Sequence, residues 1–268
     1  FFGSTTSPID FGCPNRNIPW RKINHQENFD LKDIWEPARF CWAAQLIQGN
    51  CLEPDSAYAN TFYSQLRTFT LLNPPFYGEN WLSAQEAAIR LIWITIGAST
   101  LTPVPEDLSI GRIIALHAER IMMTRSYAKA QRNNHWLSES AGLMTAATVL
   151  PDHPDASQWF ERGWNDYQFA LNDQILPDGA YIQQSANYQR LMLQLTIWVD
   201  FLIRLRGINW PKRLQEKISK SIDWLAKITD SHSGSAWNLG HNDGAWLFPF
   251  TGDFSDYRPT LQTAANTF

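Results

Sequence analysis

Three short segments combine side chains that can donate hydrogen bonds or move protons with signals for a turn or a helix start. The first spans residues 133–139, where Asn133 and Asn134 can cap a helix and His135 follows in its first turn. An amide and an imidazole both donate hydrogen bonds, so this pair could bind a carboxylate. Glu139, one turn after His135, could hold the imidazole in one tautomer. A capped helix with a hydrogen-bonded histidine is an equally good interpretation of the segment alone.

The second segment begins with Pro177-Asp178-Gly179, which is typical of a turn. Ser185 and Tyr188 follow at a spacing that puts them on one face of a helix, and Ser185 is a candidate contact for a substrate. A phenol has a pKa of about 10, so Tyr188 could donate a proton at neutral pH, and it could accept one where a nearby cation lowers that value. The alternative is that Tyr188 packs its ring and leaves its hydroxyl in water.

The third segment, residues 237–246, holds the turn signal Asn242-Asp243-Gly244. His241, Asn242 and Asp243 are candidate contacts for a substrate, although an ordinary loop explains the pattern as well. With 13 Trp among 268 residues, sugar stacking is a further possibility. Trp81, Trp136 and Trp237 are candidates for it.

Helical periodicity dominates the elements that would position these residues. The pattern predicts helices at about 30–49, 55–72, 83–99, 106–127, 134–149, 155–174, 182–206 and 211–230. Residues 1–29 are expected to be irregular and residues 231–268 to be a loop-rich passage. The fold class is therefore all-α, with helical hairpins whose ring would leave a cleft lined by loops and helix starts. Glu86 and Arg90 stand four residues apart, which predicts an internal ion pair.

Composition excludes several functional classes. The net charge of −4 and the pI of about 5.9 argue against a nucleic-acid partner. The longest uncharged apolar run, residues 91–101, is too short for a membrane segment. We find neither the histidine and cysteine spacings of a metal site nor a glycine-rich phosphate loop, so we expect no cofactor.

Taken together, the motifs resemble the heparinase II/III-like polysaccharide lyases, which include alginate lyases. The matching stretches are Lys32-Asp33-Ile34-Trp35-Glu36-Pro37-Ala38-Arg39-Phe40, Asn80-Trp81, Glu86-Ala87-Ala88-Ile89-Arg90, Asn133-Asn134-His135, Pro177-Asp178-Gly179 with Ser185 and Tyr188, Leu239-Gly240-His241-Asn242-Asp243-Gly244 and Tyr257-Arg258-Pro259. The resemblance implies an incomplete (α/α) toroid, followed in the family by a β-sandwich domain that this chain does not include. It also implies Tyr188 as the catalytic tyrosine and Asn134 and His135 at the substrate carboxylate. One position departs from the family, which often has His where this chain has Gln189.

The resemblance implies cleavage of an acidic polysaccharide by β-elimination. Two alternatives stay open. A glycoside hydrolase on a similar ring could use two of the carboxylates Glu139, Asp178 and Asp243. A non-catalytic module could bind polysaccharide or serve its production. We expect this chain to be a piece of a longer protein, and we expect a periplasmic or secreted location. Which uronic-acid polymer is cleaved stays open at this stage.

Overall fold

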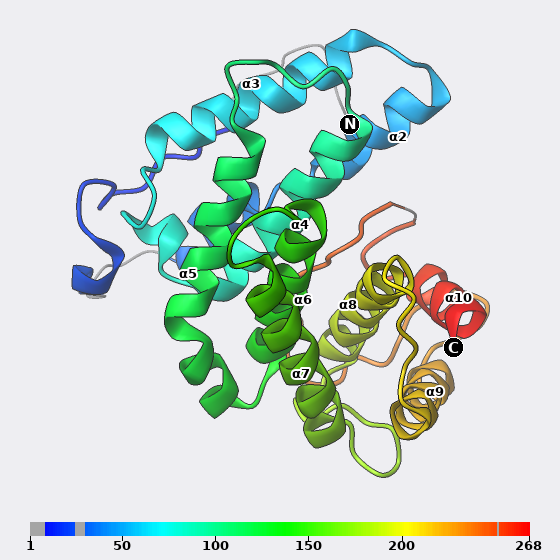
Figure 1. Ribbon diagram of the computed structural model, residues 1–268. Helices are drawn as coiled ribbons and strands as arrows, with labels where there is room; N and C mark the ends of the chain where they lie inside the picture. Colours follow the sequence, from blue (N-terminus) through cyan, green and yellow to red (C-terminus); the bar gives the residue numbers. More distant parts are fainter. Residues whose placement is uncertain (1–8, 25–29, 251) are drawn as a thin grey trace. The chain divides into compact units, whose positions relative to one another are not determined.

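The computed structural model describes residues 9–24, 30–250 and 252–268. The chain divides into two compact units, unit 1 up to Arg120 and unit 2 from Ile121 to Phe268. Each unit is built from α-helices (Figure 1). Among the described residues, β-structure is limited to isolated bridges. The prediction of an all-α fold class is confirmed.

The described residues of unit 1 contain four α-helices and the first half of a fifth. They are α1 (Leu31–Ala38), α2 (Ala43–Leu52), α3 (Ser56–Leu72), α4 (Ala84–Thr100) and α5 (Ile110–Gln131), which continues into unit 2. Short 3-10 helices, η1 (Trp20–Lys22) and η2 (Glu79–Trp81), lie before α1 and before α4. Side-chain caps explain three of the helix starts: Asp30, Asp55 and Ser83 each accept a bond from a backbone N–H in the first turn.

The prediction of one helix over residues 30–49 is wrong, because the structure has two. Pro37 lies in the last turn of α1, and Phe40 then adopts a left-handed backbone with φ 64°. No helix can continue through that conformation. The ring of Phe40 is fully buried and stacks on Phe11, with 5.4 Å between the centroids. Tertiary packing of one aromatic ring thus outweighs the local helical pattern.

The predicted ion pair between Glu86 and Arg90 is also wrong. Glu86 instead accepts two hydrogen bonds from Arg39, at 2.7 Å from Nε and 2.9 Å from Nη2. Arg90 donates to His117 Nε2 and to the carbonyls of Ala38 and Asn80. The two side chains share one face of α4, but each finds a better-placed partner on another segment.

Unit 2 consists of the end of α5 and five further helices. These are α6 (Asn134–Val149), α7 (Ala156–Gln174), α8 (Ala186–Arg204), α9 (Lys212–Lys227) and α10 (Arg258–Thr267). The helices α6 and α7 pack as a hairpin, and α8 packs on α6 (Figure 1). Gly163 allows the close approach within the hairpin, because a Cβ there would lie 2.8 Å from the carbonyl oxygen of Ser140.

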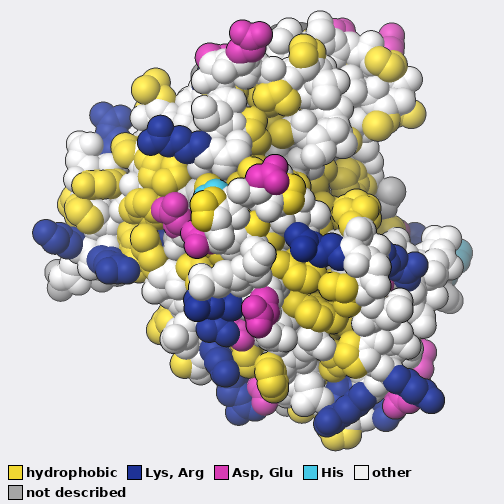
Figure 2. Space-filling model, in the orientation of Figure 1, with side chains coloured by type: hydrophobic (Ala, Val, Ile, Leu, Met, Phe, Trp, Pro, Cys, Tyr) yellow, Lys and Arg dark blue, Asp and Glu magenta, His cyan; other side chains and the backbone are white. Residues whose placement is uncertain are grey.

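Ion pairs connect the end of α5 to α7. Arg125 pairs with Asp166, and Arg132 pairs with Asp173 at 2.8 Å. Figure 2 shows dark blue and magenta side chains side by side over this part of the molecule. Arg125 near the end of α5 and Arg132 just after it are therefore each balanced by a carboxylate of α7.

The last part of the chain contains one element that the sequence pattern does not predict. Residues 231–257, apart from residue 251, form loops with two isolated bridges, from Thr229 to Ala236 and from Ser235 to Asp256. The chain then enters α10, which packs on α8 and α9. Pro259 stands in its first turn, and only Thr260 and Ala264 are buried, so the helix has a weak apolar signal. Within the described residues, no helix is both long enough and apolar enough to span a membrane.

Candidate active site

The first turn of α8 is organised by the hydroxyl of Ser185. Ser185 is the N-cap residue, and its Oγ accepts a bond from the backbone N–H of Tyr188 at 3.2 Å. The same hydroxyl donates to the carbonyl of His241 at 2.5 Å. Ser185, predicted as a substrate contact, is 1% exposed and uses its hydroxyl to join the helix to the loop that follows Trp237.

That loop, residues 239–244, lies against the start of α8, and each of residues 185–188 donates a hydrogen bond to it. The backbone N–H of Ala186 donates to the carbonyl of Leu239 at 3.0 Å, and the side chain of Asn187 donates to the carbonyl of Gly244 at 3.0 Å. The hydroxyl of Tyr188 donates to Asp243 Oδ1 at 3.1 Å. The second and third polar segments of the sequence, more than 50 residues apart, therefore form one structure.

Two glycines make this approach possible. Gly240 has a φ of 69°, and a Cβ there would lie 2.3 Å from the carbonyl oxygen of Gln184. At Gly244 a Cβ would lie 3.1 Å from the ring of Tyr188. The loop between them carries His241, Asn242 and Asp243, all exposed. Asn242 bonds to Asn238 within the loop, at 2.5 Å between side chains.

The first polar segment lies at the same end of unit 2. The side chain of Asn133 caps α6 through the N–H of His135 at 3.0 Å, as predicted. The backbone N–H of Asn134 donates to Gln183 Oε1 at 2.9 Å, three residues before α8 begins. Gln183 therefore joins the starts of α6 and α8. The sequence alone does not indicate this role of Gln183, because the bond depends on two helix starts that meet only in the folded chain.

The two residues of the Asn-His pair differ in exposure. Asn134 is buried at 4% exposed, whereas the side chain of His135 is 29% exposed. His135 Nδ1 lies 3.9 Å from Glu139 Oε1, so the predicted neighbour is in place at the distance of an ion pair rather than of a hydrogen bond. The role of both residues toward a substrate carboxylate stays a prediction.

Tyr181 and Tyr188 belong to one segment but differ in burial and in access to solvent. Tyr181 is buried, its hydroxyl donates to Gln174 Oε1 at 2.7 Å, and burial raises its pKa well above the ordinary value. Tyr188 is half-buried, and its hydroxyl reaches the exposed Asp243. Of these two phenols, Tyr188 is the one with access to solvent.

The three candidate tryptophans are placed very differently. Trp81 is buried in unit 1, beside His117 at 4.7 Å between rings, and its Nε1 donates to the carbonyl of Asn73. Trp136 is buried in α6. Trp237 is 72% exposed and stands two residues before the loop 239–244. Only the indole of Trp237, among these three, is open to a sugar ring without rearrangement.

Gln189, where the family often has histidine, serves the fold. Its Nε2 donates to the carbonyls of Gly179 and Ser221 and to the Ser221 hydroxyl, and its Oε1 accepts from the N–H of Tyr181 at 2.7 Å. The side chain is fully buried. It therefore fixes the Pro177-Asp178-Gly179 turn against α9, and it lies inside unit 2 rather than with the exposed groups.

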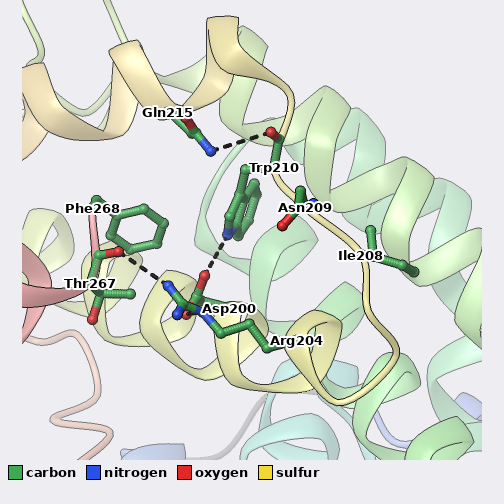
Figure 3. Close-up of a pocket in the computed structure, with 8 residues that line it drawn as sticks. All are labelled: Asp200, Arg204, Ile208, Asn209, Trp210, Gln215, Thr267 and Phe268. Atoms are coloured by element: carbon green, nitrogen blue, oxygen red, sulfur yellow. Dashed lines mark hydrogen bonds and ion pairs between the residues drawn. The ribbon is translucent and has the colours of Figure 1, made fainter.

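A separate cavity of about 240 Å³ lies at the other end of α8 (Figure 3). Asp200 in its wall pairs with Arg204 at 2.6 Å and accepts from Trp210 Nε1 at 3.0 Å. None of the predicted site residues lines it. Nowhere in the described part of the chain do three or more His, Cys, Asp or Glu side chains gather as they would to hold a metal ion.

Comparisons with known proteins agree with this structure. No curated protein matches the chain. A solved heparinase III gene product has a similar fold, with a TM-score of 0.58 and 19% identity over 78% of this chain and 36% of the other. A crystal structure of heparinase III gives a TM-score of 0.62 and 16% identity over 77% of this chain and 33% of the other. The chain thus spans about a third of the length of these proteins.

The likeness bears out the predicted fold, the helical toroid class of stacked hairpins. The sequence model of the heparinase II/III N-terminus matches residues 9–230, which is most of the chain. The chain belongs to the heparinase II/III N-terminal family.

Proposed function

We propose that this chain supplies the proton donor and the carboxylate-binding groups of a polysaccharide lyase. The single observation that carries the proposal is the position of the Tyr188 hydroxyl. It lies in the first turn of α8, partly exposed, at the end of unit 2 where Gln183 joins α8 to the Asn134-His135 start of α6. Membership in the family supports the reaction class.

The reaction is a β-elimination on a uronic acid. A base takes the C5 proton, the electron pair of that C–H bond forms the C4=C5 double bond, and the C4–O bond to the next sugar breaks. The departing oxygen takes a proton from the Tyr188 hydroxyl. The C5 proton is very weakly acidic, because the neighbouring carboxylate already carries a charge. Donors aimed at that carboxylate stabilise the developing negative charge by several kcal/mol.

Asn134 and His135 are the proposed donors to the carboxylate. The N-terminus of α6 adds a favourable end of the helix dipole for an anion. His135, the more exposed of the two, is also the candidate base for the C5 epimer whose proton faces it. The proposed location, periplasmic or secreted, rests on the family alone.

Trp237 is the proposed platform for a sugar ring next to the cleaved bond. Its indole is exposed, and its backbone N–H is fixed to the carbonyl of Ile228 at 2.9 Å. Replacing Trp237 with Ala removes the large apolar face of the indole that would pack against the sugar ring. We expect a higher KM with little change in kcat.

The test uses the full-length protein and a panel containing a glycosaminoglycan and alginate. New reducing ends and near-ultraviolet absorbance are measured together, because elimination leaves a conjugated double bond and hydrolysis does not. Rising absorbance in step with reducing ends supports the lyase. Reducing ends without absorbance indicate hydrolysis, and binding with neither signal indicates a non-catalytic module; both outcomes contradict the proposal.

A further inference from the structure

Asp243 touches the proposed proton donor and has no role in the function described so far. Its Oδ1 accepts the hydrogen bond from the Tyr188 hydroxyl at 3.1 Å. We propose that Asp243 is the positioning residue of Tyr188: its carboxylate aims the phenol and keeps it protonated, so that Tyr188 acts as the acid and another group acts as the base. This inference rests on the proposed function of Tyr188.

The carboxylate is held in place from both sides. The carbonyl of His241 is fixed by the Ser185 hydroxyl, and the carbonyl of Gly244 is fixed by the Asn187 side chain. Further along, the N–H of Leu247 donates to Gln194 Oε1 at 3.0 Å. Each anchor belongs to α8 or its cap, so Asp243 moves with the helix that carries Tyr188. An exposed aspartate in an unanchored loop would not hold a phenol in this way.

The glycines on either side show that the fit is close. At Gly240 a Cβ would lie 2.3 Å from the carbonyl oxygen of Gln184, which leaves no room for a side chain. At Gly244 a Cβ would lie 3.1 Å from the ring of Tyr188, which is a tight contact. Asp243 stands between them. The loop thus presents one carboxylate to one phenol and encloses the ring on its Gly244 side.

The pairing has a chemical consequence. A phenolate next to this carboxylate would put two negative charges within about hydrogen-bond distance, which disfavours the ionised phenol. Tyr188 therefore enters the reaction as a neutral phenol and turns its O–H from Asp243 to the departing oxygen. It cannot at the same time be the group that removes the C5 proton, so that proton passes to a different base, with His135 the candidate. The phenolate left behind then regains a proton from water.

Other titratable groups stand on the elements that meet at this helix start. They are His135 and Glu139 on α6, Tyr181 before α8, Arg190 on α8 and His241 in the loop. Arg190 is turned away: its guanidinium donates to the carbonyl of Phe254 and to Asn187 Oδ1, and it lies over the rings of Phe254 and Tyr257. Tyr181 is held by Gln174. Asp243 has a direct bond to the Tyr188 hydroxyl, and replacing it with Asn changes the charge beside that hydroxyl.

The experiment follows the ionisation of Tyr188 directly. Full-length protein is labelled with ¹³C at the tyrosine Cζ, and the Tyr188 signal is assigned by its loss in Tyr188→Phe. Asp243→Asn keeps the shape and an acceptor oxygen but removes the charge. We expect Tyr188 to titrate about one pH unit lower in Asp243→Asn than in the wild type. Asp253→Asn is the matched control, because the Asp253 carboxylate accepts bonds from the N–H and the hydroxyl of Ser255 in its own turn.

Kinetics on a polymer that the wild type cleaves provide the second readout. We expect kcat of Asp243→Asn to fall about tenfold, because a neutral amide oxygen holds the phenol less firmly than a carboxylate does. This loss is smaller than the roughly 10²–10⁴-fold expected for losing the general acid itself. We also expect the alkaline limb of the rate profile to move to lower pH. Asp243→Glu, which keeps the charge, should retain the wild-type limb. A Tyr188 signal that titrates in Asp243→Asn no earlier than in the wild type overturns the inference. The titration needs no turnover, so it is decided separately from whether Tyr188→Phe abolishes the activity.

Discussion

Two polar clusters of the molecule, one in each unit, differ in how far their side chains are buried. In unit 1, Arg90 donates from Nε to His117 and from its two terminal nitrogens to the carbonyls of Ala38 and Asn80, and Arg90 and His117 are both buried. In unit 2, Tyr188 is half-buried and bonds to the exposed Asp243. In the first cluster the donors of Arg90 bond to buried groups and stabilise the fold, whereas in the second the hydroxyl of Tyr188 lies within reach of solvent.

The histidines make the same distinction. His117 accepts from Arg90 at Nε2, so its Nδ1 carries the proton that goes to the carbonyl of Ile113 at 2.7 Å. Burial, together with the charge of Arg90, lowers the pKa of His117 to about 3. It stays neutral at physiological pH and cannot exchange protons there. His135 has 29% of its side chain exposed and lies at a helix start. A histidine that serves the fold and one that can serve a substrate are thus told apart by burial and by the partners of both ring nitrogens.

The largest expected effect tests whether the cluster in unit 1 is structural. Arg90→Met leaves three buried acceptors without donors, and each costs about 1–3 kcal/mol. We expect the free energy of unfolding to fall by about 3–5 kcal/mol, measured by denaturant titration. Arg67→Met is the control, since Arg67 pairs with Asp107 on the surface. It should change stability by less than about 1 kcal/mol. A fall of less than about 1 kcal/mol in the free energy of unfolding of Arg90→Met would show that the buried cluster contributes little to stability.

Gln189 provides a second test of the difference between the two clusters. It is adjacent to Tyr188 in sequence, but its side chain is fully buried like that of Arg90. Gln189→Ala removes four buried hydrogen bonds and should cost about 2–3 kcal/mol of stability, with kcat nearly unchanged at temperatures where the protein is folded. Gln215→Ala, on the exposed side of α9, is the control. A selective loss of kcat with normal stability would move Gln189 into the reactive cluster.

The pH dependence of stability tests the neutral state of His117. Its folded pKa of about 3 lies below the ordinary 6.5, so the unfolded state binds more protons between those values. The stability that His117 contributes is present above pH 6.5 and is lost as the pH falls toward 3. Between these two pH values, His117 contributes about 1.4 kcal/mol per pH unit to the slope of the free energy of unfolding against pH. The contribution of His117 is obtained by measuring the free energy of unfolding against pH for the wild type and for His117→Gln and taking the difference. Identical pH dependence in the two proteins would refute the lowered pKa of His117.

The smallest effect concerns the cap that carries the site. Ser185→Ala removes the bonds to the Tyr188 N–H and the His241 carbonyl. Loss of an N-cap costs about 1 kcal/mol. Because the same hydroxyl anchors the loop that carries Asp243, we also expect a severalfold loss of kcat. Asp55→Ala, which removes the cap of α3, is the matched control and should lower stability alone.

The sequence predicted local features well and long-range ones poorly. The helix over 134–149 and the helix beginning near Ser83 were recognised because caps and apolar periodicity agree at those positions. The break at Phe40 was missed, since it depends on where a distant core accepts a ring. The partner of Glu86 was missed for a similar reason: Arg90 is four residues away and Arg39 is 47.

The candidate site was predicted as three separate segments. That two of them form one structure depends on a loop path between residues 231 and 257 that no periodicity reveals. The bond from Tyr188 to Asp243 joins residues 55 apart and requires Gly240 and Gly244 to let the loop approach. The role of Gln183 in joining α6 to α8 likewise has no signature in the sequence, since it depends on two helix starts meeting.

The most direct test of the account is the turnover of Tyr188→Phe in the full-length protein, measured by near-ultraviolet absorbance on a polymer that the wild type cleaves, together with its free energy of unfolding. We expect kcat to fall by about 10²–10⁴ while stability changes by less than about 1 kcal/mol, because the bond from the Tyr188 hydroxyl goes to an exposed carboxylate. Turnover at the wild-type rate in a stably folded Tyr188→Phe would contradict the central claim that this phenol is the proton donor.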